Sequence, residues 1–153
     1  MLVLTCQIGD HRLALDVRRV AEVVPRVRLQ SAACGPDWLA GTFVYRGQVV
    51  PVVDLHRLVG AGECPQHLSS RIILVPHPGG GAGRLLGLLA ARVADVRDVP
   101  EPSGDSPRLT APGRPDLGPT LVDGAGVLHL MDVGCLLPEI GAGGRALVAA
   151  GEP

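Results

Sequence analysis

The chain contains 153 residues, of which 46% are hydrophobic and 19% are charged, and its formal net charge is −1. This composition supplies enough apolar side chain to bury a core, so it excludes a chain that is disordered throughout. A near-neutral charge with one Trp, one Tyr and one Phe argues against a nucleic-acid surface, and the absence of Lys excludes phosphate-loop and Schiff-base lysines.

Short stretches rich in Val, Leu and Ile alternate with 21 Gly and 14 Pro, a rhythm typical of many short strands joined by turns. The sequence therefore predicts a mainly β protein with little helix. The expected strands are, in chain order, Leu2–Ile8, Leu13–Val17, Ala21–Val24, Thr42–Tyr45, Val49–Asp54, Arg71–Pro76, Leu85–Ala90, Ala94–Val99, Pro119–Val122 and Val127–Met131. Short helical turns are expected at Asp37–Leu39, Leu55–Val59 and Val133–Leu137.

The apolar runs are too short, and too often broken by Arg, Gly or Pro, to insert into a membrane. Met1–Cys6 lacks the charged and apolar regions of a leader, so we expect a first strand there and a cytoplasmic protein. The four cysteines form no CxxC pair, which favours reduced, structural thiols.

An internal repeat divides the chain. Arg19–Val23 recurs as Arg92–Val96, and Val49–Leu55 recurs loosely as Val127–Val133. In the second pair, the expected strand of each copy ends at an Asp, which is Asp54 in the first copy and Asp132 in the second. We interpret each Asp as the cap of the helical turn that follows it.

Two copies of this size predict two small β subdomains that share one core, because neither is large enough to bury a core alone. The boundaries we expect are one domain over residues 1–141, with subdomain one at about 1–60 and subdomain two at about 70–137. A proline-rich loop at 100–115 and a flexible tail at 142–153 complete the prediction.

Two alternative functions rest on partial motifs. Gly79–Gly83 follows an expected strand and could open a nucleotide-binding loop of an enzyme. The acidic residue that such a unit needs would be Asp98, but Pro100 and Pro102 follow it directly, which suits a turn better. Cys64 and His67, with His77 as a third ligand, have metal-ligand spacing and could belong to a β-barrel that binds a small ligand or a metal. Neither motif is complete, so we expect no enzyme, no metal and no cofactor.

Two charged residues are not explained by local structure. Glu22 is a carboxylate in an otherwise apolar strand, and Arg46 precedes Gly47 at a tight turn that requires the glycine but not the arginine. Our hypothesis is that Glu22 and Arg46 approach each other on one face and form part of a docking surface.

These residues lie in segments that resemble the CheW family of chemotaxis coupling proteins. The most specific segment is Gly41–Leu55, a strand followed by Arg46-Gly47 and a second strand that ends in Pro51-Val52-Val53-Asp54-Leu55. The match extends to Leu13–Pro25 and Pro36–Gly41, and in the second half to Gly87–Val96 and Gly126–Leu137. Trp38 with Tyr45–Gly47 looks similar to coupling proteins of alternative, Wsp-type chemosensory systems.

The resemblance implies two intertwined five-stranded SH3-like barrels around a common core. It also implies a non-enzymatic adaptor between the cytoplasmic tip of a methyl-accepting chemoreceptor and the regulatory domain of a CheA-type histidine kinase. Positions that match the family's receptor-binding groove are Val20, Glu22, Arg46 and Leu89, and Gly41 matches a position linked to kinase coupling.

Overall fold

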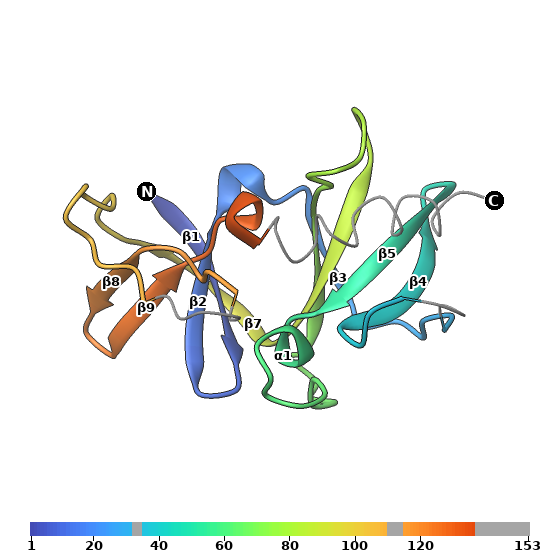
Figure 1. The fold of residues 1–153 in the computed structure, drawn as a ribbon, viewed down its shortest axis with the longest axis horizontal. Helices are drawn as coiled ribbons and strands as arrows, with labels where there is room; N and C mark the ends of the chain where they lie inside the picture. The colour runs from blue at the N-terminus through green and yellow to red at the C-terminus, as the bar shows by residue number, and fades with distance from the viewer. Residues whose placement is uncertain (32–34, 110–114, 137–153) are drawn as a thin grey trace.

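The computed structural model describes residues 1–31, 35–109 and 115–136, and the fold is drawn in Figure 1. Within these ranges the chain forms nine strands and three short helical segments. The strands are β1 (Leu2–Ile8), β2 (His11–Asp16), β3 (Glu22–Pro25), β4 (Leu39–Tyr45), β5 (Gln48–Asp54), β6 (Arg71–Pro76), β7 (Leu85–Asp98), β8 (Thr120–Asp123) and β9 (Gly126–Leu130). The helical segments are the 3₁₀ helix η1 (Val17–Arg19), the α-helix α1 (Leu55–Leu58) and the 3₁₀ helix η2 (Val133–Leu136).

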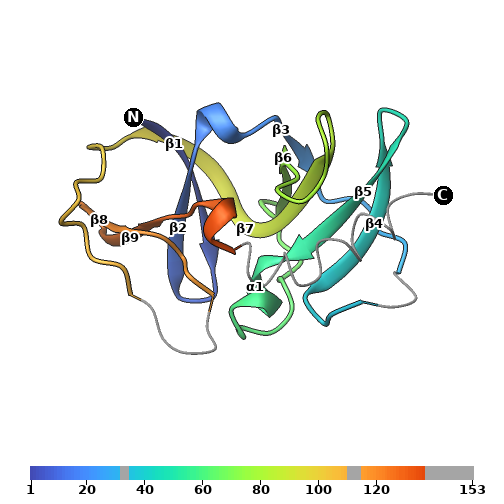
Figure 2. The same cartoon turned by 45° about the horizontal axis from the view of Figure 1, so that its top comes forward.

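Strand β7 holds the two halves of the molecule together. Its first part pairs with β6, from Pro76 opposite Leu85 to Arg71 opposite Ala90, and runs parallel to β5. Its last part pairs with β1, where Leu2 lies opposite Asp98. Figure 2 shows β7 as one curved band that passes from one group of strands to the other.

The sequence analysis split β7 into two strands, at Leu85–Ala90 and Ala94–Val99, and the structure joins them. The register against β1 shifts between Thr5 and Gln7, so β7 carries extra residues at this point, and Arg92 adopts a φ of 51° there. Such a bulge bends a strand without ending it, which a pattern of apolar residues does not reveal.

The strand pairing corrects the predicted subdomain boundaries. One group consists of β3, β4, β5, β6 and the first part of β7, and the other of β1, β2, β8, β9 and the last part of β7. Residues 1–16, expected in subdomain one, thus pair with the second group, and β6, expected in subdomain two, pairs with the first. Each group has five strands with β7 shared, so the expected intertwining is confirmed.

The repeat marks equivalent positions in the two groups. In the first, β5 runs into α1, and in the second, β9 is followed by η2. The β1–β2 hairpin and β6 lie outside the repeat. Each pairs with the group formed mainly by the other half of the chain. The repeat therefore revealed the duplication, but it could not assign the strands that lie outside it.

The expected common core is present between the two groups. Its buried members come from β1, β2, β5, α1, β6, β7 and the segment after β9, and they include Leu4, Ile8, Leu13, Leu15, Val53, Leu55, Ile73, Leu86, Leu88, Val93, Met131 and Leu136. Smaller apolar clusters fill each group separately. Burial of side chains from both groups in one cluster makes each group depend on the other for stability.

Other predicted elements differ at their ends. The helical turn expected at Asp37–Leu39 is wrong at Leu39, which begins β4 because it pairs with Val53. Residues 100–109 of the proline-rich loop form no strand, although Arg108 bridges to Pro119. Residues 110–114 of that loop and the predicted tail at 142–153 lie outside the described residues.

An ion-pair cluster ties the β8–β9 turn to β2. Both terminal nitrogens of Arg12 donate to the carboxylate of Asp123, at 2.8 and 2.7 Å, and Arg97 lies 3.3 Å from the same group. The hydrogen bond from Arg12 holds the pKa of Asp123 well below its ordinary value. The folded state therefore favours the ionised form of the Asp123 carboxylate.

The carboxylate of Asp54 caps α1, as the sequence analysis expected, and it also anchors the loop that follows. It accepts hydrogen bonds from the backbone N–H groups of His56 at 2.9 Å, Arg57 at 3.4 Å and Cys64 at 3.0 Å, and its residue is only 1% exposed. Asp132 caps η2 through one bond, from the N–H of Gly134 at 2.9 Å, and its side chain is 44% exposed. The two caps therefore differ in burial and in the number of donors that they satisfy.

Replacement of Asp54 by Ala should lower the free energy of unfolding by about 2–3 kcal/mol, because it leaves buried N–H groups without an acceptor. Asp132→Ala is the matched control and should cost about 0.5–1 kcal/mol. Urea denaturation of both variants measures the difference. Equal losses would contradict the assignment of Asp54 as a buried anchor.

Acid should destabilise the protein before its carboxylates titrate. Burial lowers the pKa of His56, His77 and His129 in the folded state. The unfolded chain, with histidine pKa values of about 6.5, therefore takes up protons first as the pH falls, and stability declines below about pH 6.5. Melting temperatures at pH 7.5 and 5.5 test this, and an unchanged or higher value at pH 5.5 would contradict it.

Candidate functional site

The structure brings Glu22 and Arg46 together, as the sequence analysis expected. Glu22 begins β3, Arg46 lies in the turn between β4 and β5, and a guanidinium nitrogen of Arg46 is 3.5 Å from a carboxylate oxygen of Glu22. The side chains are 77% exposed for Arg46 and 44% exposed for Glu22. An exposed ion pair of this kind adds at most about 1 kcal/mol to stability, so the fold gives little reason for its presence.

The backbone at Arg46 is in the left-handed region. Arg46 has a φ of 46° and Gly47 a φ of 80°, and Tyr45 pairs with Gln48 across them. A two-residue hairpin turn with positive φ at both positions favours Asn or Gly at the first and Gly at the second. Gly47 meets this requirement, whereas Arg46 occupies a position where its side chain adds strain.

Two neighbours restrict the Arg46 turn. The guanidinium carbon of Arg46 lies 5.1 Å from the centre of the Tyr45 ring, within the range of a cation–π contact. The side chain of Gln48 accepts a hydrogen bond from the N–H of Leu85 at 3.2 Å and donates to the carbonyl of Gly83 at 3.1 Å. The β4–β5 turn is thereby fastened to the β6–β7 loop, so Arg46 is presented on a braced support.

Gln48 was missed by the sequence analysis. The available signal was an amide side chain at the start of an otherwise apolar strand, directly after the Arg-Gly turn. Its partners are 35 and 37 positions away in the chain, so only the tertiary structure identifies them.

The remaining groove residues behave differently. Val20 is half-buried and packs against the common core, two positions before Glu22. Leu89 is only 2% exposed and packs with buried residues such as Val50 and Ile72. This part of β7 lies between β5 and β6, and Leu89 also lines the groove described below. Its expected part in receptor binding stays a prediction.

Gly41 has a steric role. Its φ is 145°, and a Cβ atom at this position would lie 2.4 Å from the carbonyl oxygen of Gln30. Without that atom, Gln30 and Thr42 form a two-way backbone bridge, with both bonds at 2.8 Å. Gly41 thus lets the segment before residue 31 lie across β4, whereas its expected part in kinase coupling stays a prediction.

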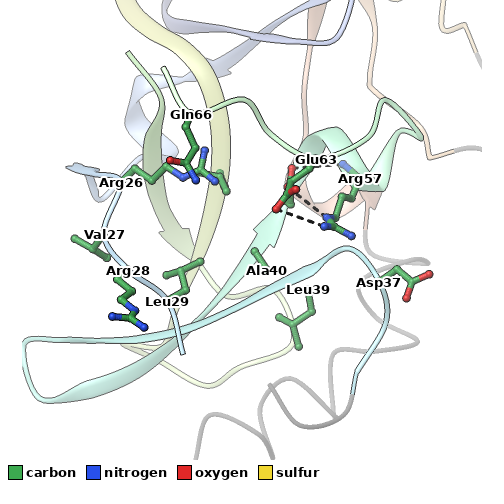
Figure 3. A pocket seen from close by; sticks show the side chains of 12 residues that line it. Arg26, Val27, Arg28, Leu29, Asp37, Leu39, Ala40, Arg57, Glu63 and Gln66 are labelled. Atoms are coloured by element: carbon green, nitrogen blue, oxygen red, sulfur yellow. Dashed lines mark hydrogen bonds and ion pairs between the residues drawn. The ribbon is translucent and has the colours of Figure 1, made fainter. Parts of the chain in front are cut away.

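This crossing segment forms one wall of a groove with a volume of about 370 Å³, shown in Figure 3. The groove has apolar residues along its length, among them Leu29, Leu39 and Ala40. At one end, Arg57 lies 3.5 Å from Glu63. Near Gln66, Arg26 donates to the carbonyls of residues 64 and 65 at 3.1 and 3.0 Å. The charged groups at the rim are therefore mostly engaged by the protein itself.

The last residues of the predicted motif are structural. Pro51 is buried in β5 opposite Thr42, and Asp54 is the buried cap described above. They hold β5 and α1 in place behind the Arg46 turn. Among Val20, Glu22, Arg46 and Leu89, then, the Glu22–Arg46 pair is the exposed charged feature.

The structure bears on the two partial motifs of the alternative functions. The Gly79–Gly83 loop joins the antiparallel strands β6 and β7, so the residues after it form a strand and not the helix of a nucleotide-binding unit. In the part of the chain that the structure describes, no three His, Cys, Asp or Glu side chains are grouped to hold a metal ion. No helix among the same residues is long and apolar enough to cross a bilayer.

Comparison with known proteins identifies relatives of the chain. A family model described as a CheW-like domain matches residues 2–140. The chain is 28% identical over 107 residues to chemotaxis protein CheW of Helicobacter pylori, a match that covers 67% of this chain and 65% of that protein. It is also 23% identical over 138 residues to chemotaxis protein CheW of Treponema pallidum, covering 86% of this chain and 78% of that protein.

Protein FrzA of Myxococcus xanthus is a third relative, 29% identical over 94 residues, with 61% of this chain and 56% of that protein covered. Among solved structures, the scaffolding protein TtCheW from Thermoanaerobacter tengcongensis matches with a TM-score of 0.71 at 21% identity, covering 86% of this chain and 84% of that one. This likeness confirms the expected fold, with two SH3-like barrel subdomains.

Replacement of Arg46 by Asn should raise the free energy of unfolding by about 0.5–1 kcal/mol, because Asn-Gly is the preferred pair in such a turn. Arg46→Ala keeps a side chain that disfavours positive φ and should not stabilise the protein. Urea denaturation distinguishes the two variants. A loss of stability in Arg46→Asn would mean that the arginine side chain supports the fold.

Proposed function

We propose that this chain, which belongs to the CheW-like domain family, couples the cytoplasmic tip of a methyl-accepting chemoreceptor to the regulatory domain of a CheA-type histidine kinase. The family consists of non-enzymatic scaffolds of chemotaxis signalling. The finer assignment of partners to this chain is our proposal.

The observation that carries the proposal is the Glu22–Arg46 pair. Its charged groups are exposed, and the arginine occupies a strained turn position that Gly or Asn would fill at lower cost. Since neither the turn nor the stability of the protein requires an arginine there, a binding role explains its presence.

The surroundings of the pair suit a helical partner. Arg46 offers donors to a carboxylate or a backbone carbonyl, and Glu22 offers an acceptor to a donor on the same partner. The exposed side chains Val23 on β3 and Val44 on β4, which are 37% and 70% exposed, add apolar area on the strands that carry the pair. The braced turn limits the entropy lost when a receptor tip binds.

The groove beside Gly41 supports a separate site for the kinase. Gly41 shapes the groove by letting residues 29 and 30 cross β4, so a larger residue would displace one groove wall. An adaptor must hold two partners at once, and a groove lined by both apolar and charged residues provides a second surface for side-chain contact.

Calorimetry of the purified chain with the kinase regulatory domain of the same organism, with and without a receptor signalling fragment, tests the proposal. A stoichiometric complex with micromolar affinity, about 8 kcal/mol of binding free energy, is the expected result. Absence of binding to every such kinase domain of that organism would overturn it.

Arg46→Asn should weaken binding of the receptor fragment about tenfold, equivalent to about 1.4 kcal/mol, while the kinase affinity stays unchanged. Arg97→Ala is the matched control, since it removes one arginine charge from the other barrel. An equal effect of both variants would indicate a general loss of positive charge and would contradict a specific role for Arg46.

A further inference from the structure

A second cavity lies where the two barrels meet, away from the Glu22–Arg46 pair. The β1–β2 turn, the loop after α1 and the bend of β7 border an open cavity of about 230 Å³, which can hold several water-sized molecules. Its polar lining residues are Gln7, His56, Glu63, His67 and Arg92. None of them belongs to the Glu22–Arg46 pair, and Glu63 also lines the groove beside Gly41.

His56 brings an unsatisfied donor to this cavity. Its residue is 4% exposed, and its Nδ1 accepts a hydrogen bond from the N–H of Gly9 at 3.3 Å. The proton of the neutral ring therefore lies on Nε2, which is buried without a hydrogen-bond partner in the part of the chain that the structure describes. A buried N–H group of this kind calls for an acceptor, and no described residue meets it in hydrogen-bonding geometry.

Arg92 brings a positive charge to the same cavity. It is the residue with a φ of 51° at the bend of β7, and it is exposed. No acidic partner of Arg92 is present within residues 1–31, 35–109 and 115–136, in contrast to Arg12, Arg18 and Arg97. The bend thus presents a cation beside the orphaned histidine donor.

The carboxylate among the lining residues does not neutralise these donors. Glu63 has a side chain that is 71% exposed and lies 3.5 Å from Arg57. Gln7 is turned to the protein, because its amide donates to the carbonyl of Gly9 at 3.2 Å. The remaining groups, His56 Nε2–H, the Arg92 guanidinium and the ring of His67, can all donate to an anion.

We propose that this cavity binds a small oxyanion of the phosphate or carboxylate class, with His56 and Arg92 as its donors. A charge-assisted hydrogen bond from Arg92 and a buried bond from His56 would satisfy both groups at once. The site joins the β1–β2 turn of one barrel to the α1 loop of the other, so an occupied site strengthens their contact. This inference does not depend on the proposed function.

Titration of the full chain with inorganic phosphate tests the site, with sodium chloride at matched ionic strength as the reference. The melting temperature should rise with the logarithm of the phosphate concentration above the dissociation constant, by roughly 5–10 °C at 100 times that constant. In parallel, the His56 Nε2 resonance in a ¹⁵N spectrum should shift and saturate at the same concentration. A stabilisation that chloride reproduces, or a His56 resonance whose shift does not saturate, would overturn the proposal.

Arg92→Asn keeps a residue that tolerates positive φ and should weaken phosphate binding at least tenfold. Arg18→Ala is the control, because Arg18 is exposed and paired with Asp16 on the surface, and it should leave binding unchanged. Equal phosphate affinity in Arg92→Asn and wild type, or a His56 resonance that does not move, would overturn the site. Binding to the kinase domain is measured separately, so failure here leaves the proposed function untouched.

Discussion

The structure depends on one long strand that serves two barrels. β7 has 14 residues, and its ends pair with β6 and with β1, which lie in different groups of strands. Because the strand bends at Arg92 without ending, its apolar side chains reach the common core from both sides of the bend. The two barrels therefore cannot separate without breaking the ladder of a shared strand, and their relative position is fixed by backbone hydrogen bonds as well as by buried side chains.

This rigidity explains how a short turn can act as a recognition element. The Arg46 turn is joined through Gln48 to the β6–β7 loop, and so to the strand that holds the molecule together. The strain at Arg46 is tolerated because these contacts determine its conformation. The same reasoning applies to Arg92, where a second arginine with positive φ lies beside an unsatisfied histidine. Both positions depart from the local preference for Gly or Asn, and both expose a cation.

The residues of the family motif have either a structural role or a role at the surface, and the structure gives a physical reason for each. Some motif residues meet steric or hydrogen-bonding requirements of β4, β5 and α1, namely Gly41, Gly47, Pro51 and Asp54. Glu22 and Arg46 meet no steric or hydrogen-bonding requirement of these elements, and in this they differ from the other motif residues. Leu89, which the resemblance places in the receptor-binding groove, is buried in this chain and offers little exposed area. A docking surface here must draw its apolar area from other residues, and Val23 and Val44 are exposed on the same strands as the pair.

The sequence by itself determined the local features. β1 and β6 occur at the predicted residues, the turn at Arg46-Gly47 was predicted from turn chemistry, and the repeat predicted two subdomains with one core. The approach of Glu22 to Arg46 was expected because both were unexplained by local structure. Tertiary structure alone decided which barrel each strand joins, that Leu89 is buried, that Gln48 braces the turn and that His56 Nε2 has no hydrogen-bond partner among the described residues. The reason is that a strand's partners, such as β1 and β7, lie far apart in the chain, and their choice depends on the packing of the whole core.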